Sequence, residues 1–378
     1  MRIGIDARMF HKAGIRRYAT ELVRNLAGID ERNDYIVYLS SDSRPENIGN
    51  LASNFHPVYL KSPLFSLGEH MDLISHLGKD RPDVFHTTFD FGVPLWPVRN
   101  VVVTVHDVFF GPCTFFRNYK TRLMYQFLTK RSVKKASIAV VISNFIKQKL
   151  IECIPRMSEH RGRIRVVPNG VGTEFTPVRG PEEAERIRRK YGIRDSYIFC
   201  VGSFASGIKN LPGILKAFSI MNDNLTDSHQ IVIAGEIFER VPEASDLIRK
   251  MKRQNRVICL GYVPDGELPS IYRNAEVFMF PSLHEGFGIP VLEAMACGTP
   301  VITSNITGMP EVAGDAALLV DPYSIDEMRG GMERVLTDVH LREDLSKKGL
   351  KRANLFSWAR TAERTLKIYE EVGNGKLR

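Results

Sequence analysis

Short apolar runs alternate with amphipathic stretches along almost the whole chain. The runs predict strands at 2–6, 35–39, 83–86, 101–105, 138–142, 164–167, 197–201, 230–234, 256–260, 277–280, 300–303 and 316–319. The stretches between them predict helices at 15–27, 117–134, 144–151, 211–221, 243–252, 267–273, 291–297 and 325–337. Continuous apolar strands separated by helices are typical of parallel sheets that are covered on both faces. Two such sets in succession predict an α/β protein with two Rossmann-like domains.

The join between the domains is predicted at 170–182, where several glycines and prolines interrupt the pattern. A length of 378 residues also suits two medium domains better than one. We therefore expect a first domain at 1–175, a second at 176–355, and a helical segment at 356–378.

The composition, 43% hydrophobic and 25% charged, is that of an ordinary globular protein. No apolar run reaches the roughly 18 residues that a membrane span needs, and Asp6 interrupts the first apolar run before it could serve as a signal peptide. The five cysteines are widely spaced and include no C-x-x-C pair, so disulfide frameworks and zinc sites are not expected. These features favour a soluble protein of the reducing cytoplasm.

The net positive charge of the chain comes entirely from its first half. Residues 1–175 carry 25 Lys and Arg against 16 Asp and Glu, whereas residues 176–378 carry 27 of each. A basic half suggests an anionic partner, although a merely basic surface explains it equally well. Within it, residues 116–135 interleave aromatic and basic side chains at helical spacing. This segment is either a helix lying on an anionic membrane surface or a packed helix with a solvated basic face.

Candidate functional residues follow several predicted strands. Ligands of open parallel sheets bind beyond the carboxyl ends of the strands. Gly14 follows the strand 2–6, His106 follows 101–105, and Gly202 and Lys209 follow 197–201. A segment running from Glu285 to Glu293 follows 277–280. If the two sheets face each other, these loops line one cleft.

The segment from Glu285 to Glu293 combines features of a diphosphate site. Gly286 and Gly288 let the backbone approach a ligand closely, and Pro290 is suited to the first turn of a helix. The free amides and dipole of that helix favour an anion such as a diphosphate. Glu293 could then accept hydrogen bonds from a ribose, and Glu285 would lie near the attached sugar. The alternative is that Glu293 only caps its helix and Glu285 is solvated.

Three further residues allow both a functional and a structural interpretation. Lys209 is suited to clamp a phosphate, although its loop lacks the P-loop spacing and the residue could simply be exposed. His106 could bind a hydroxyl or take part in acid–base chemistry, or be structural. Gly14 could let the helix at 15–27 direct its N-terminus at a phosphate, or merely begin that helix.

Taken together, these motifs resemble glycosyltransferase family 4, a family of retaining GT-B enzymes. The resemblance covers essentially the whole chain and is densest from Phe280 to Val301. It extends to Pro310-Glu311-Val312 and the run 314–322, Val167-Pro168-Asn169-Gly170-Val171, Thr104-Val105-His106-Asp107, and Val201-Gly202-Ser203 with Lys209-Asn210. It implies a GT-B fold, in which two Rossmann-like domains face each other and the final helix crosses back onto the first. The first domain would bind the acceptor and the second the donor.

The resemblance also implies roles for individual residues. Glu285 would contact the donor sugar, Glu293 the ribose, Lys209 the phosphates, Gly14 the phosphate from the facing domain, and His106 the transferred sugar or the acceptor. Gly202 and the backbone at Phe287, Gly288 and Ile289 would complete the donor site. Such enzymes usually need no metal and no cofactor. Many relatives have Arg where this chain has Ile208, and Gly where it has Arg16; Arg16 either narrows the approach to the phosphate or supplies the missing cation.

The function expected from the resemblance is retaining transfer of a hexosyl unit, with mannosyl from GDP-mannose favoured, to a hydroxyl of a surface polysaccharide or lipid-linked glycan. One alternative is a GT-B-like nucleotide-sugar epimerase, which needs no acceptor. The other is a non-enzymatic module that binds an anionic ligand, motivated by the basic half. A nucleic-acid partner is not expected, because no known nucleic-acid motif is present. The expected location is cytoplasmic, either free or peripheral on the inner face of the membrane.

Overall fold

A computed structural model of the chain describes residues 1–9, 13–40, 51–62, 66–95, 98–108, 119–154, 157–178, 180, 182–194, 196–204, 207–236 and 242–375. The chain divides into two compact units. Unit 1 comprises Met1–Gly170 and Trp358–Arg378, and unit 2 comprises Val171–Ser357. The sequence-based domain limits were 175 and 355, whereas contacts divide the chain after 170 and 357.

Unit 1 contains a seven-stranded parallel sheet in the order β3-β2-β1-β4-β5-β6-β7. Its strands are β1 (Arg2–Asp6), β2 (Asp34–Ser40), β3 (Phe55–Leu60), β4 (Val84–Thr87), β5 (Val101–Val105), β6 (Ile138–Val141) and β7 (Ile164–Val166). Its helices are α1 (Ala13–Ile29), α2 (Leu67–Asp80), α3 (Tyr119–Lys135), α4 (Asn144–Cys153) and α14 (Trp358–Gly373), with a 3₁₀ segment at Met157–Arg163. The central strands are buried along their whole length, as their uninterrupted apolar runs predict.

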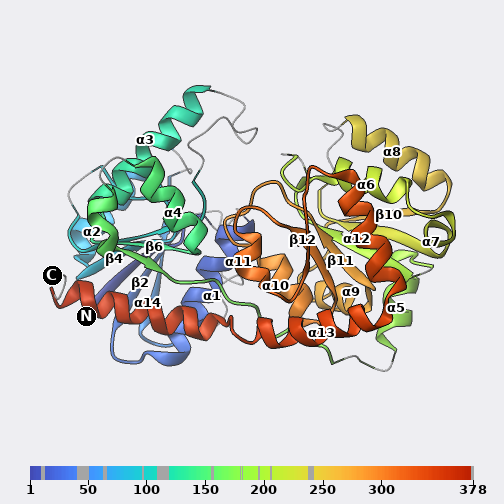
Figure 1. The fold of residues 1–378 in the computed structure, drawn as a ribbon. Coiled ribbons are helices and arrows are strands. Elements are labelled where there is room, and N and C mark those ends of the chain that lie inside the picture. The colour runs from blue at the N-terminus through green and yellow to red at the C-terminus, as the bar shows by residue number, and fades with distance from the viewer. Residues whose placement is uncertain are drawn as a thin grey trace. The chain divides into compact units, whose positions relative to one another are not determined.

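The last helix, α14, packs along α1, so the two ends of the chain lie in the same unit (Figure 1). Tyr369 of α14 is fully buried, and its hydroxyl lies 2.6 Å from Nδ1 of His86 on β4. This hydrogen bond ties the C-terminal helix to the centre of a sheet formed almost 300 positions earlier in the chain.

Unit 2 contains a six-stranded parallel sheet in the order β10-β9-β8-β11-β12-β13. Its strands are β8 (Ser196–Val201), β9 (His229–Ala234), β10 (Val257–Gly261), β11 (Val277–Phe280), β12 (Val301–Ser304) and β13 (Leu318–Val320). Its helices are α5 (Glu183–Tyr191), α6 (Leu211–Ser219), α7 (Asp223–Ser228), α8 (Pro242–Arg253), α9 (Leu268–Asn274), α10 (Ile289–Ala296), α11 (Met309–Ala313), α12 (Ile325–Thr337) and α13 (Val339–Ala353).

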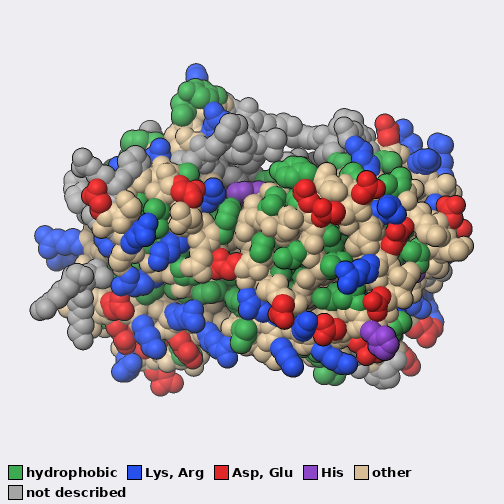
Figure 2. Space-filling model, viewed as in Figure 1, with side chains coloured by type: hydrophobic (Ala, Val, Ile, Leu, Met, Phe, Trp, Pro, Cys, Tyr) green, Lys and Arg blue, Asp and Glu red, His purple; other side chains and the backbone are tan. Residues whose placement is uncertain are grey.

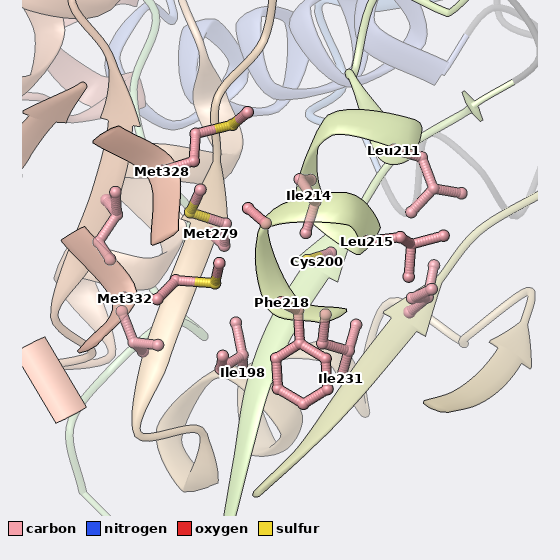
Figure 3. Close-up of a cluster of buried hydrophobic side chains, with 14 of the residues drawn as sticks. Ile198, Cys200, Leu211, Ile214, Leu215, Phe218, Ile231, Met279, Met328 and Met332 are labelled. Carbon is pink, nitrogen blue, oxygen red and sulfur yellow. The ribbon is translucent and has the colours of Figure 1, made fainter. Parts of the chain in front are cut away.

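One face of the unit 2 sheet is covered by α6 and α12. Leu215 and Phe218 of α6 point onto the strands, and Met332 of α12 meets Met279 of β11 from the same side (Figure 3). All four side chains are fully buried. This cluster packs the sheet against α6 and α12, and loops follow the carboxyl ends of β8 and β11.

The strand order reverses once in each sheet, between β1 and β4 in unit 1 and between β8 and β11 in unit 2. A crevice opens at such a reversal because the two connections leave in opposite directions. The predicted α/β class with two parallel-sheet domains is confirmed. Among the helices of the described ranges, none is long and apolar enough to cross a membrane.

Candidate functional site

Two loops of unit 2 meet at the reversal of its sheet. One follows β8 and carries Lys209, and the other follows β11 and carries Glu285. The loops are joined by the carbonyl oxygen of Ile208, which accepts hydrogen bonds from the Leu283 amide at 2.8 Å and from the Ser282 hydroxyl at 3.0 Å. The sheet topology therefore brings together two segments that lie more than 70 residues apart in the chain.

Lys209 and Glu285 form an ion pair between these loops, with Nζ donating to Oε1. The Ser282 hydroxyl lies 3.0 Å from the same carboxylate oxygen. The Lys209 ammonium also lies 4.8 Å from the centre of the Phe280 ring, within the range of a cation–π contact. The lysine side chain is 21% exposed and the glutamate 15%, so the pair is mostly buried but remains accessible to a ligand. A diphosphate could replace the carboxylate as the partner of the lysine.

Gly202 makes room for this lysine. Its φ of +150° lies in a region that favours glycine, and a Cβ placed there would lie 3.1 Å from Cγ of Lys209. The lysine stem therefore runs directly across the glycine backbone. A Cβ at 202 would press on this stem, which would then have to shift by a few tenths of an ångström.

The segment after Glu285 turns sharply into α10. Gly288, with φ of +100°, is the N-cap residue, and Ile289 begins the helix, with Pro290 in its first turn. Phe287 is buried, and its ring meets Phe356 edge-on at 5.8 Å. This anchor fixes the backbone at 287–289, whose amides and helix dipole form an environment that favours an anion.

The surroundings of Glu293 differ from those of Glu285. It lies on α10 with only 3% of its surface exposed, and the hydroxyl of Tyr272 on α9 donates a hydrogen bond to Oε2 at 3.0 Å. Tyr272 in turn packs edge-on against Phe199 and Phe278. The carboxylate is thus held by a buried tyrosine that the sequence pattern did not single out. The contact of Glu293 with a ribose stays a prediction.

His106 lies at the carboxyl end of β5 in unit 1, where its ring meets Tyr18 of α1 edge-on at 4.8 Å. Nε2 lies 2.9 Å from the carbonyl oxygen of Thr88, so Nε2 carries the hydrogen and Nδ1 is the acceptor of the ring. Burial lowers the pKa of His106 to about 4. The imidazole is therefore neutral near pH 7 and is better suited to accept a hydrogen bond from a hydroxyl than to act as a charged group.

Gly14 lies in the first turn of α1 and is exposed, and no described residue would touch a Cβ placed there. Gly14 and His106 belong to unit 1, whereas the other predicted site residues belong to unit 2. Among the described side chains, no group of three His, Cys, Asp or Glu residues is arranged to hold a metal ion. The expectation of a metal-independent, cofactor-free site stays a prediction.

Comparison with known proteins identifies two matching families. The family "Glycosyl transferases group 1" matches residues 183–352, and the family "Glycosyltransferase Family 4" matches residues 13–175. The first match contains Lys209 and the segment from Glu285 to Glu293, and the second contains Gly14 and His106.

Individual proteins that are similar to this chain include mannosyltransferases and a solved structure of a synthase. The chain is 28% identical to the O-antigen chain mannosyltransferase B of Escherichia coli over 372 residues, which is 94% of this chain and 96% of that protein. It is 31% identical to the serotype-specific mannosyltransferase WbdA of the same organism over 61% of this chain, but only 28% of that longer protein. Among solved structures, sucrose-phosphate synthase from Thermosynechococcus elongatus superposes with a TM-score of 0.79 at 19% identity, covering 99% of this chain and 100% of the other. The last likeness supports the GT-B fold.

Proposed function

Because the chain belongs to glycosyltransferase family 4 and is a hexosyltransferase, we propose that it transfers a mannosyl unit from GDP-mannose with retention of configuration. The acceptor is a hydroxyl of a surface polysaccharide or of a lipid-linked glycan. The mannosyl unit and the polysaccharide acceptor are suggested by relatives named as O-antigen chain and serotype-specific mannosyltransferases, and GDP as the nucleotide is part of our proposal. The epimerase alternative is not favoured by these relatives.

The observation that carries the proposal is the ion pair between Lys209 and Glu285 at the reversal of the unit 2 sheet. When the donor binds, its diphosphate becomes the partner of Lys209, and Glu285 is released to accept hydrogen bonds from hydroxyls of the sugar. As the glycosidic bond breaks, negative charge grows on the departing GDP. Lys209 and the amides at the start of α10 stabilise that charge. Glu285 orients the sugar and is not a covalent nucleophile.

His106 acts on the acceptor side of the reaction. Its neutral ring presents Nδ1 as an acceptor, because Nε2 donates to Thr88. It therefore positions a hydroxyl of the acceptor or of the transferred sugar. Transfer proceeds without a bound metal, since the lysine and the helix amides supply the positive environment for the diphosphate.

The site is tested with Lys209→Ala and Glu285→Gln, assayed by GDP release from GDP-mannose with an alkyl mannoside as acceptor. Each variant is expected to lose activity by about 100-fold, the usual effect of removing one charge-stabilising group. Lys190 and Glu267 form a second Lys–Glu ion pair in unit 2, outside these loops. Lys190→Ala and Glu267→Gln are therefore matched controls that should keep activity. Full activity in Lys209→Ala and Glu285→Gln would show that the site is elsewhere.

The donor is tested separately by thermal shift with GDP, UDP and ADP sugars, because a ligand that binds only the native state raises its melting temperature. GDP-mannose is expected to give the largest shift. A larger shift with a UDP or ADP sugar would replace the proposed donor but leave the site assignment intact. A changed sugar after incubation with donor alone would instead indicate an epimerase.

We also propose that α3 contacts an anionic membrane surface. Its first turns expose apolar side chains, each between 44% and 63%, namely Tyr119, Leu123, Met124 and Phe127. Lys120, Lys134 and Lys135 are exposed on the same helix, and Figure 2 shows apolar and basic side chains together at its outer end. Apolar side chains flanked by cations are suited to the boundary of an anionic bilayer. The part of the predicted segment before Tyr119 lies outside the described residues.

Sedimentation with phosphatidylglycerol vesicles tests this contact. The double variant Leu123→Ser with Phe127→Ser is expected to bind about 100-fold more weakly, since each of the two apolar side chains contributes about 1.5 kcal/mol when it is buried in the interface and each factor of ten corresponds to about 1.4 kcal/mol. Tyr262→Ser, which removes an exposed aromatic of unit 2, is the control. Unchanged binding of the double variant, or equal binding to neutral phosphatidylcholine vesicles, would contradict the proposal.

A further inference from the structure

The loop at 305–308, between β12 and α11, carries unfavourable local features. Thr307 has a φ of +61°, a left-handed conformation that β-branched residues rarely adopt. The hydroxyls of Ser304 and Thr307 are buried and have no hydrogen-bond partner among the described residues. Strain and unpaired hydroxyls persist only where the surroundings impose the position, and they are concentrated at functional sites.

What imposes the position is the backbone of the Glu285 segment. The amide of Gly308 donates to the carbonyl oxygen of Glu285 at 3.0 Å. A Cβ placed at Gly308 would lie 2.6 Å from the carbonyl oxygen of Gly286 and 3.0 Å from that of Glu285. Gly308 itself has φ of −77°, which any residue adopts, so the requirement for glycine comes from this close approach and not from backbone conformation.

The other side of the loop is anchored independently. Arg352 of α13 donates to the carbonyl oxygens of Glu311 and Val312 at 2.6 and 2.9 Å, and this fixes the end of α11. Met309, the first residue of α11, packs against Gly288, where a Cβ would lie 3.0 Å from its sulfur. These contacts of α11 hold the loop 305–308 against the Glu285 segment.

We propose that the loop 305–308 is a rigid support that sets the position of the Glu285 carboxylate toward the hydroxyls of the donor sugar, with Gly308 as the positioning residue. Glu285 is then held at both ends. The Gly308 amide donates to its backbone carbonyl, Lys209 donates to its carboxylate, and the Ser282 hydroxyl lies 3.0 Å from the same carboxylate oxygen. When the diphosphate takes over Lys209, the support keeps the carboxylate in place. This inference rests on the proposed donor site.

The test measures the dissociation constants of GDP-mannose and GDP for the full chain by calorimetry. In Gly308→Ala the added Cβ pushes the backbone at 285–286 aside. In Thr307→Pro, φ is forced to about −65°, which moves the Gly308 amide without adding an atom at 308. Each variant is expected to raise the ratio of the GDP-mannose constant to the GDP constant by about tenfold, because small displacements of a positioning group weaken only the contacts that it orients. GDP binding itself should stay near that of the unaltered chain.

Gly330 on α12 is the control, since a Cβ there meets nothing within 4 Å and Gly330→Ala should leave the ratio unchanged. An unchanged ratio in Gly308→Ala or Thr307→Pro would overturn the inference. Loss of GDP binding in both would also overturn it, because the loop would then support the whole unit and not the sugar contact. If the unaltered chain does not bind GDP-mannose, the proposed donor is wrong, and the same ratio is measured with UDP-glucose against UDP.

Discussion

The cores of the two units share a parallel-sheet plan but differ in their chemistry. In unit 2 the space between the sheet and helices α6 and α12 is filled by aliphatic, aromatic and thioether side chains (Figure 3). In unit 1 the sheet carries buried ionic and hydrogen-bonded groups at the ends and centres of its strands. An apolar core accepts exchange of similar volumes, whereas a buried polar network is stable only when every member has its partner.

The ionic group of unit 1 follows β1. Arg8 donates to both carboxylate oxygens of Asp6, at 2.8 and 2.7 Å, and to Glu69 at 2.7 Å. All three side chains are almost completely buried. One arginine thus serves two carboxylates, and the network fixes the exit of the chain from β1 relative to α2.

The hydrogen-bonded group lies deeper in the same sheet. The Thr104 hydroxyl is 2.8 Å from Nε2 of His86 and 2.9 Å from the hydroxyl of Tyr18, while Nδ1 of His86 contacts Tyr369. Burial lowers the pKa of His86 to about 3, so the ring is neutral. The network joins α1, β4, β5 and α14, and so connects the last helix to the sheet through buried polar contacts.

The largest effect on this difference between the two units is expected from Arg8→Met, which nearly keeps the length of the side chain but removes its charge. The free energy of unfolding should fall by about 3–5 kcal/mol, because two buried carboxylates lose their shared partner. Urea denaturation followed by circular dichroism measures the loss. Arg2→Met breaks the exposed pair with Asp34 and should cost about 1 kcal/mol or less. Similar small losses in both variants would mean that the buried group adds no stability.

Acidification should weaken unit 1 through its buried histidines. The pKa of His86 in the folded chain, about 3, lies below the ordinary value near 6.5. Below about pH 6.5 the unfolded chain therefore binds a proton that the folded chain does not, so the free energy of unfolding is highest above pH 6.5 and falls as the pH falls. Between pH 7 and pH 5 the loss is about 2 kcal/mol at about 1.4 kcal/mol per pKa unit. His106 acts in the same direction. Asp90, whose pKa burial raises to about 6, acts in the opposite direction and offsets about 1 kcal/mol.

The measurement compares the free energy of unfolding at pH 7 and pH 5 in the unaltered chain and in His86→Gln. The variant should lose less stability on acidification, even if it is less stable at both pH values. His340→Gln, at an exposed position of α13, should retain the pH dependence of the unaltered chain. An identical slope in His86→Gln would rule out the buried histidine as its source.

The smallest effect is expected in the apolar core of unit 2. Met332→Leu keeps volume and polarity nearly constant, and the neighbouring Met279 can adjust, so the cost should be below about 1.5 kcal/mol. Thermal unfolding measures it, with Phe218→Ala as the reference for a true cavity at about 3–5 kcal/mol. A loss for Met332→Leu as large as that for Phe218→Ala would show that this core is as specific as the polar network of unit 1.

Most strands of the fold were predictable because buried parallel strands are continuous apolar runs. The exception is β3, which contains Pro57 and is buried only at its first and last residues, Phe55 and Leu60. It is an edge strand next to β2, where a missing amide removes no ladder bond on the open side. The sequence pattern does not predict helix α13 either, since its sequence is rich in charge and its few apolar positions are buried mainly against α10. Both elements owe their structure to a neighbour more than to their own pattern.

The candidate site was predictable in part. Glycine and proline around Glu285 indicated a tight turn into a helix, because backbone freedom is a local property, and the structure places Gly288 at that turn with a positive φ. The burial of Glu293 against Tyr272 and the support of Glu285 by Gly308 were not predictable. Both contacts join separate elements, and their polar or small residues carry no signal until those elements meet.

The local sequence pattern predicted which residues follow the carboxyl ends of buried strands, namely Lys209 after β8 and Glu285 after β11. It could do so because apolar periodicity and turn preferences depend on residues that are neighbours in the sequence. The meeting of these two residues depended on strand order. The chain passes through β9 and β10 between them, yet β11 pairs with β8, and this long-range pairing places the two loops side by side. The pairing of strands that are not consecutive in the chain depends on the crossover connections between them, and these are formed only in the folded unit.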